Sequence, residues 1–170
     1  MKPTTLVIDV DGVLTDGTAT YTADGKASKT FGPDDHDALK LLAPHLDIRF
    51  VSADERGFVI SKRRVSQDMG FPLDLVSVVD RVAWITDQFD LDDVIFMGDG
   101  IFDAAVFAAV GYSICPADGF PATRDAADFV TTCGGGRRAV AEACVHILEK
   151  WFGGVPSPLT PARVPEGVEA

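Results

Sequence analysis

The sequence is poor in cysteine and in positive charge, and it contains no long apolar run. Its three cysteines are an odd number without the spacing of a metal site, so we expect buried thiols in a reducing compartment. No stretch approaches the ~20 apolar residues that span a bilayer, and no secretory segment precedes the first predicted strand. We therefore expect a cytoplasmic protein without a membrane partner. The net charge of −11 argues against nucleic acid as a partner, because its phosphates would be repelled.

The rest of the composition is that of an ordinary globular domain, with 46% apolar and 24% charged residues over 170 positions. Short apolar runs, typical of buried strands, alternate with helical segments along the chain. We expect strands at 5–8, 48–51, 75–79, 94–97, 112–114 and 129–130, and helices at 35–42, 55–69, 80–89, 102–110, 122–127 and 137–152. This alternation predicts an α/β fold, Rossmann-like with three layers and a mostly parallel sheet, over residues 1–152.

Two segments depart from this alternation. Threonine-rich runs on either side of an Asp24-Gly25 turn predict a β-hairpin over residues 18–31. The last segment, 153–170, contains four prolines and little apolar material besides valine, so we expect a mobile C-terminal tail.

Two carboxylates, Asp9 and Asp11, stand where the first predicted strand ends. Because side chains alternate across a strand, residues two apart lie on the same side, and we expect both carboxylates to face the same way. Each would raise the pKa of the other unless a cation lay between them. A solvated acidic turn would explain Asp11-Gly12 but not Asp9, which still belongs to the apolar run. We therefore favour a metal or catalytic site.

Polar residues, Ser52 and Asp99, also end two other predicted strands, and ligands of parallel α/β sheets bind outside the carboxyl ends of the strands. Carboxylate and carbonyl oxygens suit Mg²⁺ held together with a phosphate. An ionised Asp9 can attack phosphorus to form an aspartyl-phosphate, and Asp11 is placed to protonate the leaving oxygen and then to deprotonate water. Ser52 and the start of the next helix can hold phosphate oxygens, and Arg81 can offset charge in the transition state.

Taken in order, these residues resemble the four motifs of the haloacid dehalogenase (HAD) superfamily of phosphohydrolases. The matching segments are Asp9-Val10-Asp11-Gly12, Ser52, Arg81 and Gly98-Asp99-x-x-x-Asp103, and the resemblance covers residues 5–152. It is specific because the motifs occur in order at strand ends, not because any one of them is rare.

A narrower resemblance is to the 3-deoxy-D-manno-octulosonate 8-phosphate (KDO 8-phosphate) phosphatases, a group that includes nonulosonate 9-phosphate phosphatases. It rests on the segment 9–17, on the hairpin and on Gly135-Gly136-Arg137 before the last helix. It implies a Mg²⁺ ion held by Asp9, the Asp11 carbonyl and Asp99, with Asp103 in a supporting position. It also implies that Asp9 is the nucleophile, that Asp11 is the acid and base, and that Ser52 and Arg81 contact phosphate.

The same resemblance implies contacts to a phosphorylated sugar acid, and the candidate residues are Thr15, His36, Ala53, Arg63 and Arg64. For the two arginines, a solvated helix face is an equally good interpretation. The chain departs from the family in four places. Arg81 replaces a usual lysine, with Lys62 as a weaker alternative for that role. Ala53 replaces a glycine, Asp35-His36-Asp37 replaces an Asp-Gly, and Arg138 replaces the last glycine of a Gly-Gly-Arg-Gly segment.

The stretches 11–52 and 52–81 are too short for the cap domain that many HAD enzymes insert. Relatives without caps form tetramers in which neighbouring subunits cover each site, so we expect a homotetramer with the hairpin at the interface. The tail could fold over a neighbour's site, although a disordered end is the stronger expectation. A phosphatase for another small sugar phosphate and a catalytically silent assembly domain are the alternatives to a sugar-acid phosphatase.

Overall fold

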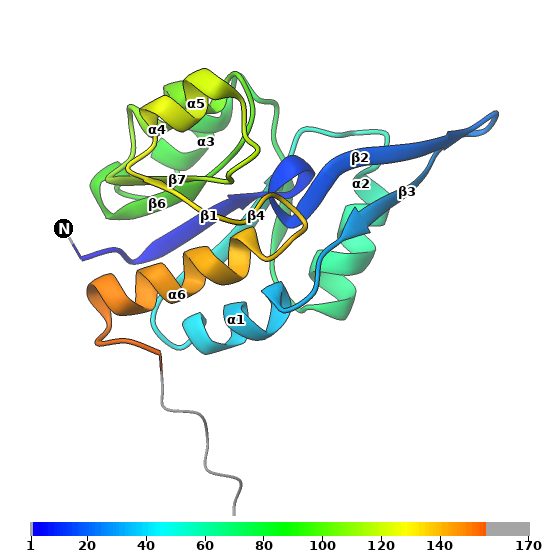
Figure 1. Ribbon diagram of the computed structural model, residues 1–170. Coiled ribbons are helices and arrows are strands. Elements are labelled where there is room, and N and C mark those ends of the chain that lie inside the picture. Colours follow the sequence, from blue (N-terminus) through cyan, green and yellow to red (C-terminus); the bar gives the residue numbers. More distant parts are fainter. Residues whose placement is uncertain (1, 156–170) are drawn as a thin grey trace, which may run out of the picture.

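The first strand, β1 (Thr5–Asp9), is buried along its whole length and lies at the centre of the sheet in the computed structural model, which describes residues 2–155 (Figure 1). Its neighbours are β4 (Asp47–Ser52) and β6 (Val94–Met97). The sheet order is β5-β4-β1-β6-β7-β8, and the six strands are parallel. The outer strands are β5 (Leu73–Leu75), β7 (Tyr112–Cys115) and β8 (Phe129–Val130). Strands covered on both faces are continuous apolar runs, which is why the sequence reveals most of them.

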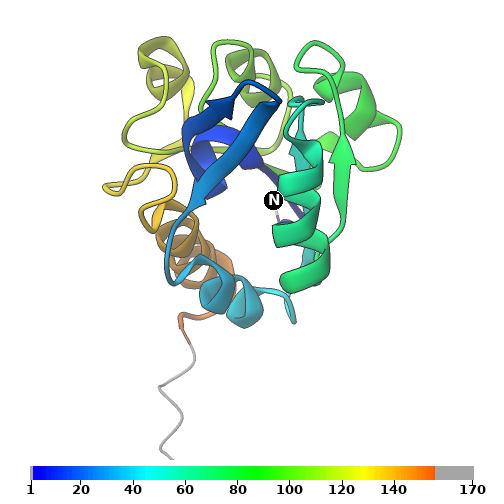
Figure 2. The ribbon, with the colours of Figure 1, turned by 90° about the vertical axis from the view of Figure 1, so that its right-hand side faces the viewer.

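Helices cover both faces of the sheet (Figures 1 and 2). On one face lie α1 (Asp35–Leu42) and α6 (Ala139–Trp151), and the core there also takes in Leu6 and Ile8 of β1. On the other face, the core takes in Val7 of β1 and residues of α3 (Arg81–Thr86) and α4 (Asp103–Phe107), and α5 (Pro121–Ala126) lies beside α4. The alternation along β1 therefore divides its side chains between two cores, and the expected three-layer α/β fold is confirmed.

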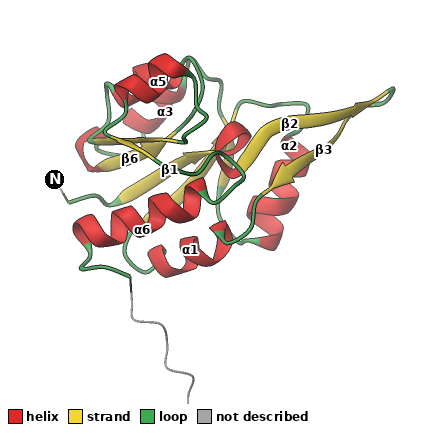
Figure 3. Ribbon diagram, viewed as in Figure 1, coloured by secondary structure: helices red, strands yellow, loops and turns green. Residues whose placement is uncertain are grey.

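The hairpin consists of β2 (Thr15–Thr22) and β3 (Gly25–Phe31) and forms a two-stranded antiparallel sheet of its own. It projects away from the central sheet, and its base lies beside α2 (Phe58–Lys62) (Figure 3). The expected hairpin is confirmed, and β2 begins three residues earlier than the sequence suggested. This earlier start brings the hairpin directly onto the acidic segment that follows β1.

The third strand differs from its predicted position, 75–79. β5 ends at Leu75, the Val76 amide makes one further bond to the Ser52 carbonyl (3.0 Å), and the chain then turns over Ser77–Asp80. This turn brings the chain to the start of α3. The expected helix at 55–69 is α2 followed by a wider helical segment, Arg63–Asp68.

Two expectations concern the surroundings of the domain. Within residues 2–155, no helix combines the length and the apolar character that crossing a bilayer requires. The cysteines are free thiols: Cys115 and Cys144 are buried and Cys133 is half-buried. Burial raises the pKa of Cys115 to about 12, which makes that thiol inert at neutral pH. From residue 156 onward, the tail lies outside the described residues.

Candidate active site

The acidic segment of the sequence lies at the carboxyl edge of the central strand. β1 ends at Asp9, and residues Val10–Leu14 form a tight turn that leads into β2. Asp11 therefore lies in a turn rather than on the strand, although its side chain and that of Asp9 line one cavity, as expected. Gly12 makes this turn with a φ of +87°, and a Cβ at this position would overlap the carboxylate of Asp99. The missing side chain thus lets the loop after β6 approach the turn.

A glycine-rich loop before α6 completes the support of this turn. The Gly136 amide donates to the Val13 carbonyl (3.1 Å), and a Cβ on Gly135 would overlap the Gly12 carbonyl. The hydroxyl of Thr15, which is fully buried, accepts hydrogen bonds from the amides of Gly12 (3.2 Å) and Gly17 (3.3 Å). The turn is consequently fixed by the Thr15 hydroxyl at its own end and by backbone contacts from the loop before α6.

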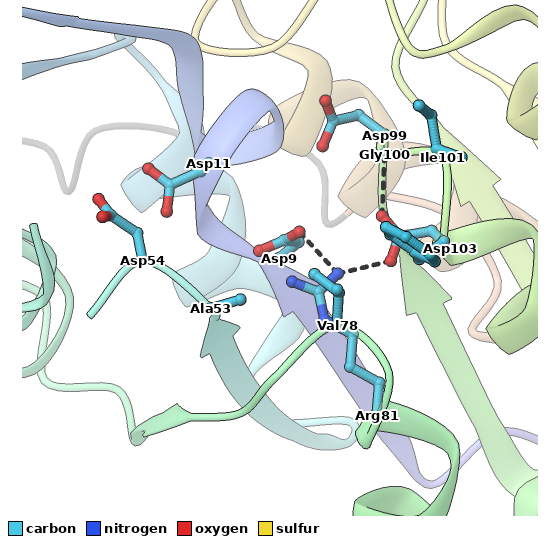
Figure 4. A pocket seen from close by; sticks show the side chains of 11 residues that line it. Asp9, Asp11, Ala53, Asp54, Val78, Arg81, Asp99, Gly100, Ile101 and Asp103 are labelled. Atoms are coloured by element: carbon cyan, nitrogen blue, oxygen red, sulfur yellow. Dashed lines mark hydrogen bonds and ion pairs between the residues drawn. The ribbon is translucent and has the colours of Figure 1, made fainter. Parts of the chain in front are cut away.

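A cavity of about 230 Å³ opens between the turn and the loops after β4, β5 and β6. Figure 4 shows that the labelled carboxylates come from opposite sides of it. Its lining residues are Asp9, Asp11, Ala53, Asp54, Val78, Arg81, Asp99, Gly100, Ile101, Phe102 and Asp103. Four separate strand ends therefore contribute to one site, at the edge where parallel α/β sheets bind their ligands.

Three of the carboxylates form a cluster on one side of the cavity. Asp9, Asp99 and Asp103 each offer one oxygen, and these oxygens lie within 4.8 Å of one another. Arg81 Nη1 contacts two members of the cluster, Asp9 Oδ2 at 2.7 Å and Asp103 Oδ1 at 2.5 Å. Both ion pairs use the same nitrogen atom, which is the geometry that a single lysine ammonium would also provide. That Arg81 takes the place of the usual lysine remains a prediction.

The cluster carries more negative charge than its protein surroundings neutralise. Three carboxylates and one guanidinium would leave two negative charges if all were ionised. Burial, only partly offset by Arg81, raises the pKa of Asp9 to about 7. Burial and the neighbouring carboxylates Asp9 and Asp103 likewise raise the pKa of Asp99 to about 7. Converging carboxylate oxygens with uncompensated charge fit a divalent metal ion, which would favour their ionised forms.

Asp11 belongs to a second, electrically balanced group of side chains. Its Oδ2 accepts a hydrogen bond from the Ser52 hydroxyl (2.8 Å), and its Oδ1 lies 2.6 Å from the Lys29 ammonium. Asp54 Oδ2 lies 2.8 Å from the same ammonium and 2.5 Å from that of Lys26. Two carboxylates therefore face two ammonium groups. The expectation that Ser52 contacts phosphate remains a prediction, because its hydroxyl contacts Asp11 here.

Sequence reasoning missed Lys26, Lys29 and Asp54. Although burial would raise the pKa of Asp54, hydrogen bonds from the two lysines and from the Gly57 amide outweigh it and hold that pKa at about 2. Both lysines belong to β3, a strand rich in polar residues that looks solvent-exposed in the sequence. Residues three apart on a regular strand face opposite sides, so their spacing gave no signal. A register irregularity between Ser28 and Lys26 interrupts the alternation, and only the fold joins these segments to Asp54.

Several expected substrate residues lie away from the cavity. The Thr15 hydroxyl forms hydrogen bonds within the turn. The ring centroid of His36 lies 6.3 Å from that of Phe71, and Arg63 Nε lies 3.3 Å from Asp68 Oδ1. Neither these residues nor Arg64 lines the cavity, whereas Ala53 does. Lys62, the weaker alternative to Arg81, is exposed on α2 and does not line it either. The structure therefore brings together the residues expected for the chemistry but, of those expected for the sugar, only Ala53.

Carboxylates follow β1 and β6 of the parallel sheet, and the buried guanidinium of Arg81 lies between them. This fold and site are those of the HAD class of hydrolases. No family model matches the chain. The chain is 33% identical over 152 residues to the KDO 8-phosphate phosphatase of Haemophilus influenzae. The aligned region covers 85% of this chain and 82% of the relative.

Two solved structures extend the comparison. The cobalt-bound KDO 8-phosphate phosphatase of Haemophilus influenzae is 28% identical, with a TM-score of 0.76 over 87% of this chain and 88% of that one. The Moraxella catarrhalis phosphatase, solved with magnesium, phosphate and KDO, is 24% identical, with a TM-score of 0.73 over 86% of each chain, and shows the shared fold. The present chain belongs to the HAD phosphatases and is a relative of KDO 8-phosphate phosphatase.

Proposed function

We propose that the protein is a Mg²⁺-dependent phosphatase that hydrolyses a phosphorylated 2-keto-3-deoxy sugar acid, either KDO 8-phosphate or a nonulosonate 9-phosphate. The observation that carries this proposal is the division of the site into two groups. One group is the carboxylate cluster, which includes the buried Asp9. The other group contacts both carboxylate oxygens of Asp11. A nucleophile and a separate proton carrier are what two-step phosphoryl transfer requires.

In the first step, a carboxylate oxygen of Asp9 attacks phosphorus and the bond from phosphorus to the sugar oxygen breaks. The electron pair of that bond goes to the sugar oxygen, which takes a proton from the Asp11 carboxyl group. In the second step, Asp11 removes a proton from water, and the water oxygen attacks phosphorus of the aspartyl-phosphate. The bond to Asp9 breaks with its electrons returning to the carboxylate, and inorganic phosphate leaves.

The metal proposed for this site is Mg²⁺, held by Asp9, Asp99 and the carbonyl of Asp11, while Asp103 holds Arg81 in place. When bound, it supplies positive charge to the phosphate oxygens. Arg81, which lines the cavity, and Lys29, which contacts the lining residue Asp11, are already paired with carboxylates. A further cation is therefore what an acidic protein needs to attract an anionic substrate.

The cavity is smaller than the ~300–1,000 Å³ of most small-molecule sites, so it suits a phosphate and leaves most of a sugar acid outside. The exposed side chains of Ile101 and Phe102 stand at its lining. We propose that neighbouring subunits of a homotetramer cover the sugar, with the hairpin at the interface. Light scattering that shows a monomer at micromolar concentration would contradict this part. That Arg63 and Arg64 bind the sugar-acid carboxylate remains a prediction. The free thiols support the proposed cytoplasmic location.

The test is phosphate release with Mg²⁺ from KDO 8-phosphate, two nonulosonate 9-phosphates, common hexose phosphates and p-nitrophenyl phosphate. The Asp9→Asn variant is the loss-of-function control, and Asp87→Asn, which changes an exposed carboxylate at the C-terminal end of α3, is its matched control. Fast turnover of one sugar acid, abolished by EDTA and by Asp9→Asn but not by Asp87→Asn, is the expected result. Weak turnover of many compounds would instead support another sugar phosphate, and no turnover would support an assembly domain.

A further inference from the structure

Lys29 is a charged side chain buried inside the protein. Its side chain is 1% exposed, and its ammonium group contacts three acceptors from three different segments. These are Asp11 Oδ1 at 2.6 Å in the turn after β1, Asp54 Oδ2 at 2.8 Å in the loop after β4, and Ser61 Oγ at 2.8 Å in α2. An ammonium group has three hydrogens to donate, so every donor of Lys29 is used.

These contacts close a ring around the carboxylate of Asp11. Lys29 joins Asp11 to Asp54, the Asp54 amide donates to the Ser52 hydroxyl (3.2 Å), and that hydroxyl donates to Asp11 Oδ2 (2.8 Å). Both oxygens of Asp11 are therefore fixed, one by each side of the ring. Rotation of the carboxylate would break one of these two contacts.

The other ion pairs at the site show why this contact is specific. Within residues 2–155, Arg81 forms ion pairs with Asp9 and Asp103 but not with Asp11, and the ion pair of Lys26 is with Asp54. Lys29 is thus the cation that reaches Asp11 among the described residues. It comes from the hairpin, so the β2–β3 insertion contributes a side chain to the interior of the site as well as an external surface.

We propose that Lys29 is the positioning residue for Asp11, an assignment that rests on the phosphatase function proposed above. Lys29 holds the Asp11 carboxyl group in the orientation from which its proton reaches the leaving oxygen. As the bond from phosphorus to that oxygen breaks, Asp11 becomes a carboxylate and Lys29 compensates the new charge. Lys29 keeps its own proton throughout, so the transferred proton comes from Asp11 alone.

The experiment compares kcat/KM for two substrates of the Mg²⁺-loaded enzyme: the best sugar phosphate of the panel, and p-nitrophenyl phosphate. A sugar alkoxide is a poor leaving group that needs a proton, whereas p-nitrophenolate leaves without one. Lys29→Met should therefore lower kcat/KM for the sugar phosphate by about 100-fold, in the range that acid catalysis contributes. It should lower kcat/KM for the aryl substrate by less than about tenfold.

Lys26→Met is the matched control, because it removes the other ammonium at Asp54 without a contact to Asp11. For Lys26→Met, the ratio of kcat/KM for the sugar phosphate to kcat/KM for p-nitrophenyl phosphate should equal that of the wild type. Ser61→Ala removes one acceptor of Lys29 and should change the ratio in the same direction as Lys29→Met, by a smaller factor; it serves as the test if Lys29→Met does not fold. Equal losses for both substrates, or no loss, in an active wild-type background would overturn the role of Lys29. A wild type that hydrolyses neither substrate would overturn the proposed function itself.

Discussion

Arg81 and Asp103 form an ion pair whose side chains are 3% and 2% exposed, with Arg81 Nη1 2.5 Å from Asp103 Oδ1. The same nitrogen lies 2.7 Å from Asp9 Oδ2, so one atom compensates two buried carboxylates. The remaining charge of Asp103 is met by the Gly100 amide, which donates to its Oδ2 over 2.9 Å. Asp103 therefore fixes both the arginine and the loop that carries Asp99.

Two substitutions of Arg81 should distinguish the effect of its positive charge from that of its guanidinium shape. Arg81→Met leaves two buried carboxylates without a cation, and removing one partner of such a pair costs about 3–5 kcal/mol in the free energy of unfolding. Arg81→Lys keeps a single nitrogen between Asp9 and Asp103 and should retain most of the stability and a measurable activity. Urea unfolding at pH 7.5 and phosphate release measure both quantities. A methionine variant as stable as the wild type would show that the ion pairs contribute nothing.

Two glycines with similar backbone angles provide a controlled test of the close approach at the site. Gly12 and Gly70 have φ values of +87° and +81°, but a Cβ at Gly12 would overlap Asp99, whereas a Cβ at Gly70 would meet nothing within 4 Å. Both alanine variants should lose about 1–2 kcal/mol from backbone strain. Only Gly12→Ala should displace the Asp99 carboxylate and so lose Mg²⁺-dependent activity, by more than about tenfold (1.4 kcal/mol). Equal activities of the two variants would contradict this account.

Stability should depend on pH through the carboxylate cluster. The folded protein raises the pKa of Asp9 and of Asp99 to about 7, above the usual value of 3.8, so it holds protons that the unfolded chain has released. Without metal, stability contributed by these groups should therefore fall as pH rises from about 4 to about 7. Because metal binding needs the ionised forms, Mg²⁺ should raise the melting temperature more at pH 8 than at pH 5.5.

The comparison variant for this measurement is Asp99→Asn, which removes one of the two titrating groups. Scanning calorimetry in EDTA and in excess Mg²⁺ should show a smaller pH dependence and a smaller metal effect for this variant. The same metal-induced shift at both pH values in the wild type would argue against a carboxylate site at this position.

A second pH effect should come from the packing of α1 on α6. Burial raises the pKa of Asp35 to about 6, although its Oδ1 accepts a hydrogen bond from the Ala141 amide (2.9 Å). Its other oxygen is buried without a partner among the described residues. Asp35→Asn keeps the acceptor and removes the charge, so the variant should gain stability relative to the wild type as pH rises from about 4 to about 6. Unfolding by urea at pH 4.5 and 7.5 measures the gain, and Asp24→Asn, on the exposed turn, should show none.

Much of the fold and half of the site could be predicted because both depend on strand ends. Buried parallel strands are continuous apolar runs, so the polar residues that follow them, Asp9 and Asp99, stand out in the sequence. The strand predicted at 75–79 was misplaced because Val78 and Val79 are apolar for other reasons: Val78 lines the cavity and Val79 is 70% exposed. An apolar run alone does not say whether its partner is a sheet or a site.

The contacts of Asp11 could not be predicted, because they depend on a long-range arrangement. Lys29 belongs to a polar hairpin and Ser61 to a helix with several basic neighbours, and neither looks buried from the sequence. For Asp11 the expected side was right but the reason was not, since the strand ends at Asp9 and it is the turn that brings Asp11 to the same cavity. The substrate contacts were inferred from resemblance alone, and the cavity of one subunit does not include Thr15, His36, Arg63 or Arg64.

The docking of the glycine-rich loop on the turn after β1 has a consequence for the order of events during synthesis. A ribosome releases Asp9 and Asp11 well before the glycine-rich loop, so the turn that holds them gains its Val13–Gly136 hydrogen bond only after more than a hundred further residues have emerged. Likewise, β1 can pair with a strand on its second side only after β6 has been synthesised. The nascent chain should therefore remain inactive until α6 and the loop before it form, and a chain truncated before residue 134 should accumulate without phosphatase activity.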